Sequence, residues 1–97
     1  MRNVLWNNKA KLDYFENIDF LLAKWSKKEA QEFIDEVHHV EYILSIGNVD
    51  FQDTDFVGVK RLVIRKQITL FYRIIDAHNL ELLRFWNNSK DINKLNL

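Results

Sequence analysis

Apolar residues dominate three segments in the second half of the chain, and short polar stretches separate them. The segments cover residues 57–64, 68–75 and 80–86 and are rich in β-branched and aromatic side chains. Runs of this kind between polar turns are typical of consecutive strands. The pattern therefore predicts a meander of three strands, and Asn3 to Trp6 are predicted to form a short additional strand at the start.

The first half of the chain instead shows the three- and four-residue apolar spacing of helices. One helix is expected to start at a cap formed by Asn7 or Asn8 and to end near Trp25. Asparagine suits this position because its side-chain oxygen accepts a free backbone N–H. The predicted buried stripe of this helix consists of Tyr14, Phe15, Ile18, Leu21, Leu22 and Trp25.

A second helix is predicted directly after the first. It begins at Ser26-Lys27-Lys28-Glu29, which has the pattern of a capping box, and Gly47 supplies the left-handed residue common after a helix end. Its predicted buried stripe consists of Ala30, Phe33, Ile34, Val37, Val40 and Leu44. The short connection between the helices predicts an αα-hairpin. Residues 48–56 are expected to form an acidic loop, and residues 91–97 a short helix or a frayed tail in which Ile92 and Leu95 could dock.

The two faces of the predicted sheet follow from the choice of turns. With turns at Lys66-Gln67 and Ala77-His78, alternation of side chains divides the strand residues into two sets. The face predicted to lie under the helices holds Val59, Arg61, Val63, Ile68, Leu70, Tyr72, Ile74, Leu83 and Phe85. The face predicted to be open holds Lys60, Leu62, Ile64, Thr69, Phe71, Arg73, Ile75, Leu80, Leu82, Arg84 and Trp86. A slip of one residue in either turn exchanges these assignments.

These elements predict one α/β (α+β) domain over residues 1–97, in which an N-terminal αα-hairpin packs on a three- to four-stranded antiparallel sheet. The chain has no Cys, which excludes disulfides, a thiol nucleophile and a Cys-based metal site. No apolar run approaches the roughly 20 residues that span a membrane, and the start MRNVLWNN lacks the apolar region of a signal peptide. We therefore expect a cytoplasmic protein that does not associate with membranes.

Charge is distributed unevenly although the net charge is zero. Residues 1–56 hold six Lys or Arg and eleven Asp or Glu, whereas residues 57–97 hold eight Lys or Arg and three Asp or Glu. Two interpretations stay open: the two halves neutralise each other, or a basic sheet face meets an acidic partner or phosphates. The three His residues show no spacing suited to a shared metal, and neither a metal nor a cofactor is expected.

The order of motifs resembles the RelE/ParE superfamily of type II toxin–antitoxin toxins. The matching residues are Ala10, Trp25, Ser26, Gly58, Lys60, Arg61, Leu62, Val63, Ile64, Leu70, Phe71, Tyr72, Arg73, Ile74, Leu82, Leu83, Phe85 and Trp86. The resemblance covers almost the whole chain. It implies a bacterial cytosolic toxin that is neutralised by an antitoxin encoded beside it.

The superfamily includes two kinds of toxin, and both remain possible interpretations. RelE-like toxins cleave mRNA on the ribosome with basic residues on the open face plus an Arg and a Tyr or His near the chain end. ParE-like toxins inhibit DNA gyrase and lack that set. Here the position of the late Arg falls near Asn88 and Ser89, and no Tyr or His follows. The expected function is therefore ParE-like inhibition of a protein target, with RelE-like cleavage as the alternative.

Most of the candidate site residues lie on the predicted open face. If the protein is a ribonuclease, Lys60, Arg73 and Arg84 are the expected cations for the phosphorane charge. The expected binding surface for an antitoxin or target comprises Lys60, Arg61, Thr69, Arg73, Arg84, Trp86 and Lys90. A third reading is an inactive relative that only binds its antitoxin.

Overall fold

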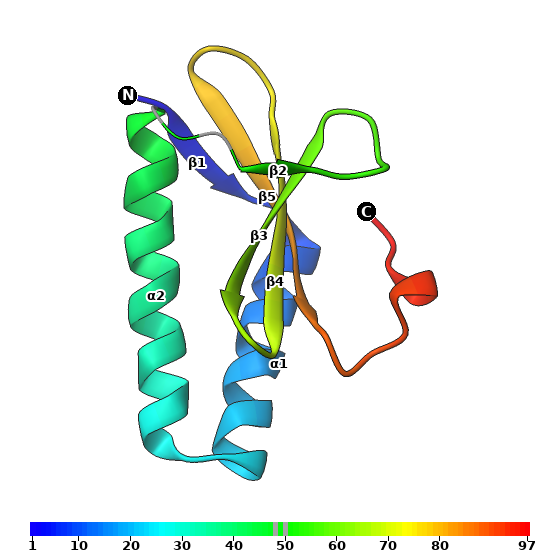
Figure 1. Ribbon diagram of the computed structural model, residues 1–97. Coiled ribbons are helices and arrows are strands. Elements are labelled where there is room, and N and C mark those ends of the chain that lie inside the picture. Colours follow the sequence, from blue (N-terminus) through cyan, green and yellow to red (C-terminus); the bar gives the residue numbers. More distant parts are fainter. Residues whose placement is uncertain (48, 50) are drawn as a thin grey trace.

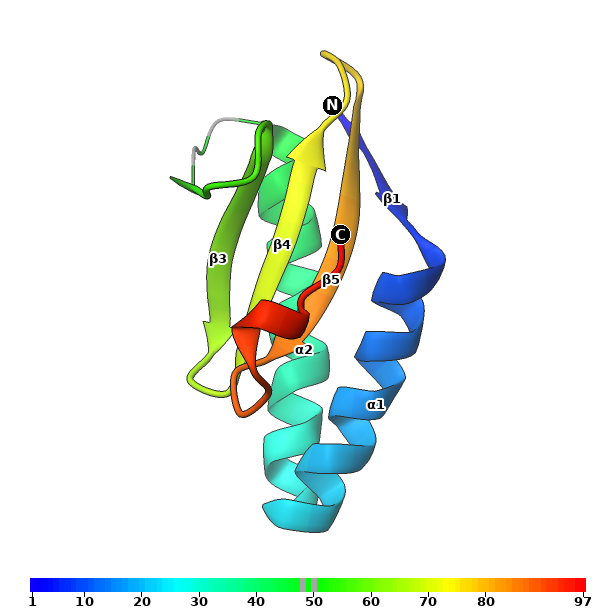
Figure 2. The same ribbon diagram turned by 90° about the vertical axis from the view of Figure 1, so that its right-hand side faces the viewer.

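Two helices cover one face of a five-stranded sheet, and the chain end lies on the other face (Figures 1 and 2). The computed structural model describes residues 1–47, 49 and 51–97. The elements are β1 (Asn3–Trp6), α1 (Asn8–Lys24), α2 (Lys27–Ile46), β2 (Gln52–Asp53), β3 (Val59–Arg65), β4 (Ile68–Ile74), β5 (Asn79–Asn87) and the 3₁₀ turn η1 (Ile92–Lys94). The predicted helical hairpin and strand meander are confirmed.

The helix ends follow the predicted capping. Asn7 Oδ1 accepts from the backbone N–H of Ala10 at 2.7 Å, and Ser26 Oγ accepts from that of Glu29 at 3.2 Å. Gly47 follows α2 with φ of 82°, a left-handed conformation in which glycine carries no steric penalty. The side chain of Glu29 does not complete a capping box, because its carboxylate binds Arg65 instead.

The sheet has the strand order β1-β5-β4-β3-β2. The meander β3-β4-β5 is antiparallel, as predicted, but β1 pairs with β5 in parallel. The hairpin of α1 and α2 returns the chain to the end of the sheet at which β1 begins (Figure 1). The antiparallel meander β3-β4-β5 then gives β5 the same direction as β1. The two-residue strand β2 lies within the predicted loop and pairs with β3; two other residues of that loop, Asn48 and Asp50, lie outside the described part of the chain.

Two β-bulges change the predicted faces of β3 and β5. Arg65 pairs with Ile68 as predicted, but an irregularity at Ile64 then pairs Val63 with Thr69 and shifts the rest of β3 by one residue. A second bulge interrupts the β4–β5 pairing between Phe71 and Tyr72. A shift of one residue moves a side chain to the opposite face.

The prediction was therefore wrong for nine strand residues. Lys60, Leu62, Ile64, Leu80 and Leu82 lie on the helix-covered face, whereas Val59, Arg61, Val63 and Leu83 lie on the open face. The prediction was right for Ile68, Leu70, Tyr72 and Phe85 under the helices and for Thr69, Phe71, Arg73 and Trp86 on the open face.

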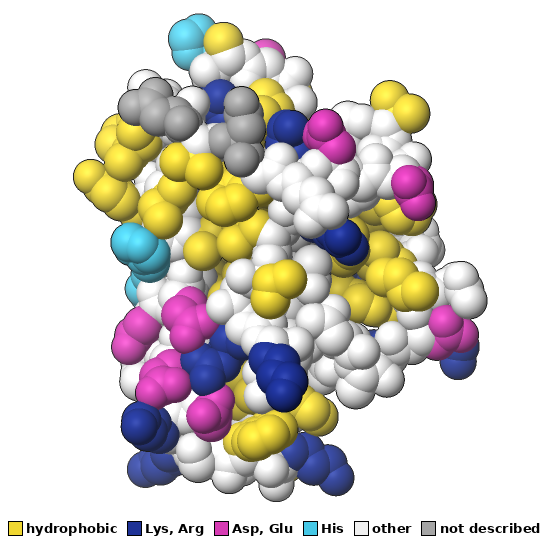
Figure 3. All heavy atoms as spheres, in the orientation of Figure 1, with side chains coloured by type: hydrophobic (Ala, Val, Ile, Leu, Met, Phe, Trp, Pro, Cys, Tyr) yellow, Lys and Arg dark blue, Asp and Glu magenta, His cyan; other side chains and the backbone are white. Residues whose placement is uncertain are grey.

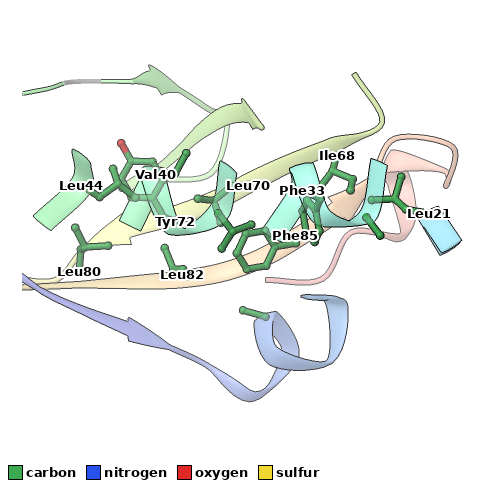
Figure 4. Packing of buried hydrophobic residues seen from close by; sticks show 13 residues of the cluster. Leu21, Phe33, Val40, Leu44, Ile68, Leu70, Tyr72, Leu80, Leu82 and Phe85 are labelled. Atoms are coloured by element: carbon green, nitrogen blue, oxygen red, sulfur yellow. The ribbon is translucent and has the colours of Figure 1, made fainter. Parts of the chain in front are cut away.

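The main core lies between α2 and the sheet (Figure 4). Phe33 packs near Phe85, with ring centroids 6.2 Å apart and planes at 87°. The predicted stripe of α2 is confirmed except for Ile34, which is half-exposed. Its buried residues are Ala30, Phe33, Val37, Val40 and Leu44. Across the core they meet Ile68, Leu70, Tyr72, Leu80, Leu82 and Phe85.

The predicted stripe of α1 is half right: Leu21 is buried, and Tyr14 and Ile18 pack against the core. The helix buries Ala10, Asp13, Asn17 and Leu21. Phe15, Leu22 and Trp25 are exposed, with Phe15 at 63%. α1 is thus rotated so that two polar residues face the sheet.

Within the described residues, no helix is long and apolar enough to cross a membrane.

Replacing Phe33 with Ala is expected to lower the free energy of unfolding by about 3–5 kcal/mol, because the emptied site lies in the packed core. The matched control is Phe15→Ala on the exposed side of α1, which is expected to cost less than about 0.5 kcal/mol. Urea unfolding of both variants measures the difference. Equal losses would contradict the assignment of the buried faces.

Candidate functional site on the open face of the sheet

The open face carries most of the residues predicted to bind a partner. Arg61, Thr69, Arg73 and Trp86 come from three neighbouring strands and point away from the helices. Thr69 and Trp86 are directly opposite each other on β4 and β5, and both are buried. Thr69 Oγ1 donates to Asn88 Oδ1 at 3.0 Å, which fixes the turn after β5. The structure therefore brings these four positions onto one surface.

Lys60 does not belong to this surface, and its predicted position was wrong. The bulge at Ile64 places Lys60 opposite Tyr72 on the helix-covered side of the sheet. Its ammonium group lies 2.9 Å from Asp53 Oδ1 on the neighbouring strand β2. The predicted trio of Lys60, Arg73 and Arg84 is therefore divided between two faces.

The two remaining members of that trio are each bound to an acid. Arg73 Nε donates to Glu81 Oε1 at 2.9 Å across the β4–β5 pair. Arg84 binds Asp13 through two hydrogen bonds, Nε to Oδ2 at 2.6 Å and Nη2 to Oδ1 at 3.0 Å. The hydrogen bonds with Asp13 raise the pKa of Arg84 further above its ordinary value. Both guanidinium charges are thus largely neutralised within the chain.

Asp13 and Asn17 are buried polar residues beside the site that the sequence analysis did not predict. They lie four residues apart on α1, one turn from each other, and are only 5% and 3% exposed. Asp13 Oδ2 accepts from the backbone N–H of Phe85 at 3.1 Å, and Asn17 Nδ2 donates to the carbonyl of Phe85 at 2.9 Å. Ala10, Asp13, Asn17 and Leu21 follow the three- and four-residue spacing of one helix face. Because two of the four are polar, this spacing did not indicate a buried face.

Two cations lie near the ring of Trp86. The guanidinium carbon of Arg84 is 5.2 Å from the ring centroid, and Lys90 Nζ is 5.6 Å away. Both distances lie within the range of cation–π attraction. Lys90 also lies 3.9 Å from Glu16 on α1, where both side chains are largely exposed and the pair adds little stability. The cations at and just after the end of β5, Arg84 and Lys90, therefore both lie beside the ring of Trp86.

A second charged cluster lies on the α2 side, away from the open face. Arg65 Nη1 donates to Glu36 at 2.5 Å, and Nη2 donates to Glu32 at 3.2 Å and also binds Glu29. Figure 3 shows acidic side chains gathered beside basic ones at the lower left of that view. Burial raises the pKa of Glu36, Arg65 lowers it, and Glu32 and Glu29 raise it again. Three carboxylates around one guanidinium hold α2 to the β3–β4 hairpin.

Neither charged region has the make-up of a metal site in the described part of the chain. In the described part of the chain, no three His, Asp, Glu or Cys side chains are grouped as metal ligands. The described strand residues of the open face include no Tyr or His. The open face presents a cluster of apolar side chains, Val59, Phe71, Leu83 and Trp86, with arginines beside it, an arrangement that suits binding.

Comparison with known proteins gives structural matches alone. No protein-family model matches the chain, and no curated protein matches it. The structure is similar to that titled the chromosomal ParDE TA system from P. aeruginosa, with TM-score 0.68 and 17% identity over 90% of this chain and 96% of that one. The chain has the RelE/ParE fold.

Two further structures share the RelE/ParE fold with this chain. One is a copper-bound mutant toxin from Helicobacter pylori, with TM-score 0.64, 16% identity and coverage of 92% and 97%. The other is the E. coli DinJ-YafQ complex, with TM-score 0.61, 8% identity and coverage of 92% and 96%. The resemblance seen in the sequence is therefore confirmed at the level of the fold.

Removing the carboxylate of Asp13 is expected to be costly. Asp13→Ala leaves the Arg84 guanidinium and the Phe85 N–H without their partner, and loss of one member of a buried pair typically costs about 3–5 kcal/mol. Asp19→Ala, an exposed position on the same helix, is the control and should change stability by less than about 0.5 kcal/mol. A loss of stability below about 1 kcal/mol for Asp13→Ala would show that the fold does not depend on this carboxylate.

The Arg65 cluster predicts a pH effect on stability. Glu36 binds its proton more tightly in the folded chain, so its contribution favours folding at low pH and is lost as the pH rises through the folded-state pKa. The melting temperature is expected to rise as the pH falls from about 7 toward 4.5, the ordinary value. Glu36→Gln should flatten this rise, and Glu16→Gln should not. If the melting temperature of Glu36→Gln depended on pH as steeply as that of the parent protein, the assignment of this effect to Glu36 would be refuted.

Proposed function

We propose that this protein is the toxin of a bacterial type II toxin–antitoxin module that acts, like ParE, on a protein target such as DNA gyrase and is neutralised by an antitoxin encoded beside it. The fold supports the class of protein, since structures titled as a toxin–antitoxin system and as a toxin complex match about nine-tenths of the chain. The target and the antitoxin both belong to the cytoplasm, where we expect the protein to act.

The pairing of the open-face arginines is the observation that carries the ParE-like mechanism. RNA cleavage by the 2′-OH needs a base, an acid and cations for the developing phosphorane charge. Arg73 is engaged by Glu81, and Arg84 is engaged by Asp13. Only Nε of Arg73 is engaged in this way, but all three nitrogens of the Arg84 guanidinium donate within the chain, so Arg84 reaches a phosphate only by giving up internal hydrogen bonds. The engagement of Arg84 therefore favours a protein target.

The second candidate is a RelE-like, ribosome-dependent mRNA endoribonuclease. Arg61 favours it, because this arginine is exposed on the open face and forms no ion pair with a described residue. Lys90 is half-exposed at the edge of the same face. Accessible cations, with Lys90 beside the ring of Trp86, suit RNA, but a general acid and base would still have to come from the ribosome or the substrate.

The test compares both targets with one protein preparation. Supercoiling of relaxed plasmid by gyrase should be inhibited by the purified protein, and addition of the antitoxin from the adjacent reading frame should restore it. Labelled mRNA in a translation extract should show no codon-specific cuts in the ribosomal A site.

The test variant in both assays is Arg61→Ala, which removes the accessible cation without touching an ion pair of the described residues. The control is Lys24→Ala at the exposed end of α1, which should leave inhibition of gyrase within about threefold of the parent protein, a shift below 1 kcal/mol. Codon-specific cleavage that Arg61→Ala weakens would reject the ParE-like proposal in favour of the RelE-like one.

A further inference from the structure

Two adjoining hollows form a groove between α1 and the chain that follows β5. The larger, of about 360 Å³, reaches the turn between β3 and β4, and the smaller, of about 210 Å³, lies beside the middle of α1. Phe20, Asn87 and Ser89 border both hollows. Asn87 pairs with Ile68, a core residue under the helices, so its side chain points away from the open face. The larger hollow falls in the size range of small-molecule sites, about 300–1,000 Å³.

The side-chain amide of Asn87 presents an unpaired donor to this groove. Its Oδ1 accepts from the backbone N–H of Ser89 at 2.9 Å and from Ser89 Oγ at 2.7 Å. A backbone N–H only donates, so these contacts fix the oxygen toward Ser89 and turn Nδ2 away from it. Although Asn87 is only 7% exposed, Nδ2 has no hydrogen-bond partner among the described residues and is not fully enclosed. A donor in this state is satisfied when a ligand supplies an acceptor.

Two aromatic side chains form the apolar wall of the larger hollow. Phe20 is half-buried, whereas Trp25, just after the last turn of α1, is 58% exposed. An indole that the fold leaves in water keeps a large apolar surface that a stacked ring can cover. Nucleobases stack on such rings, because every base has a π-face. The wall therefore suits a flat heteroaromatic ligand.

The turn between β3 and β4 supplies the polar rim of the larger hollow. Asn88 holds this turn in place, since its Nδ2 donates to the carbonyl of Lys66 at 3.2 Å and its backbone N–H donates to that of Gln67 at 2.7 Å. The Lys66 ammonium is exposed and forms no ion pair with a described residue, and the Gln67 amide forms no hydrogen bond with one. Among the described residues, none that borders this hollow is acidic. The rim thus offers an amide able to contact the edge of a base and a cation suited to a phosphate.

We propose that this groove binds a free purine nucleotide. The base stacks on Trp25 and accepts from Asn87 Nδ2 at one edge. The Gln67 amide contacts its other edge, and the phosphate lies at Lys66. A purine fits better than a pyrimidine, because its two fused rings cover more of the indole and carry acceptor nitrogens on both edges. The groove is not part of the surface proposed to bind a toxin target, so this site does not depend on the proposed function.

The site is tested by titrating the full chain with adenosine and guanosine monophosphates, followed by calorimetry and by the NMR resonance of the Trp25 indole N–H. Saturable binding with a Kd below about 1 mM is expected, and uridine monophosphate should bind at least about threefold more weakly. Trp25→Leu removes the stacking surface at an exposed position and should weaken binding at least about fivefold. Phe15→Leu, at an exposed aromatic position of the same helix, is the control and should bind like the parent chain. Absence of saturable binding of both purine nucleotides, or equal affinities of the parent chain and Trp25→Leu, overturns the proposal.

Two further variants test the polar contacts. Lys66→Gln should weaken binding of the nucleotide at least about threefold but leave binding of the nucleoside, which has no phosphate, unchanged. Asn87→Asp keeps the acceptor for Ser89 and removes the donor, so it should weaken binding of the uncharged nucleoside at least about threefold. Lys24→Gln, an exposed cation that does not border the groove, is the control. Nucleotide binding by Lys66→Gln as tight as that by the parent chain overturns the proposal, and this variant changes an exposed residue, so it decides the question even if Asn87→Asp does not fold.

An RNA of about ten adenosines distinguishes a free nucleotide from the same base within a nucleic acid. If the groove takes a free nucleotide, Trp25→Leu should change the affinity of the chain for this RNA by less than about twofold. An RNA that binds at least about tenfold more tightly than the monophosphate, and that Trp25→Leu weakens at least about fivefold, would assign the groove to RNA and overturn the proposal.

Discussion

The carboxylate of Asp13 contacts three parts of this molecule: it belongs to α1, it binds the edge of β5, and through Arg84 it reaches the C-terminal segment. β1 ends at Trp6, but β5 continues to Asn87, so the edge of β5 beyond β1 presents backbone groups that need partners. Asp13 accepts from the N–H of Phe85 and Asn17 donates to its carbonyl, so α1 continues the hydrogen bonding of the sheet with side chains. The same carboxylate holds Arg84, whose guanidinium lies near Trp86 and binds the C-terminal segment.

This edge contact explains the orientation of α1. A helix that followed apolar spacing alone would bury Phe15, Leu22 and Trp25 and leave Asp13 in water. That arrangement would leave the Phe85 N–H and carbonyl buried without partners, and each such group costs about 1–3 kcal/mol. The rotated helix satisfies both groups and still buries Ala10 and Leu21 completely. The observed orientation of α1 thus pairs the edge of β5 while Phe15, Leu22 and Trp25 stay exposed.

Local patterns in the sequence were sufficient for the elements and their caps but not for the faces of the strands. Asn7, Ser26 and Gly47 act through neighbours a few residues away, so their roles are visible in the sequence. The face of Lys60 depends on one extra residue near Ile64, and that of Leu83 on a bulge opposite Phe71. Neither Ile64 nor Leu83 is a glycine, so the residue type does not indicate a bulge at either position. Asp13 was missed for a different reason, because its partner lies 72 residues away and polar residues are normally read as exposed.

The division of charge between the halves of the chain is largely used inside the fold. The basic strand half meets the acidic helical half at Arg65, which binds Glu29, Glu32 and Glu36, and at Arg84, which binds Asp13. Arg73 is neutralised within the strand half by Glu81. The pairing of Arg73 and Arg84 weakens the attraction of this face for polyanions, because counter-ion release depends on unpaired cations, and Arg61 is the exposed arginine that remains. Apolar contact around Trp86 then contributes to recognition on the open face, and a protein segment supplies such contact better than a nucleic acid backbone.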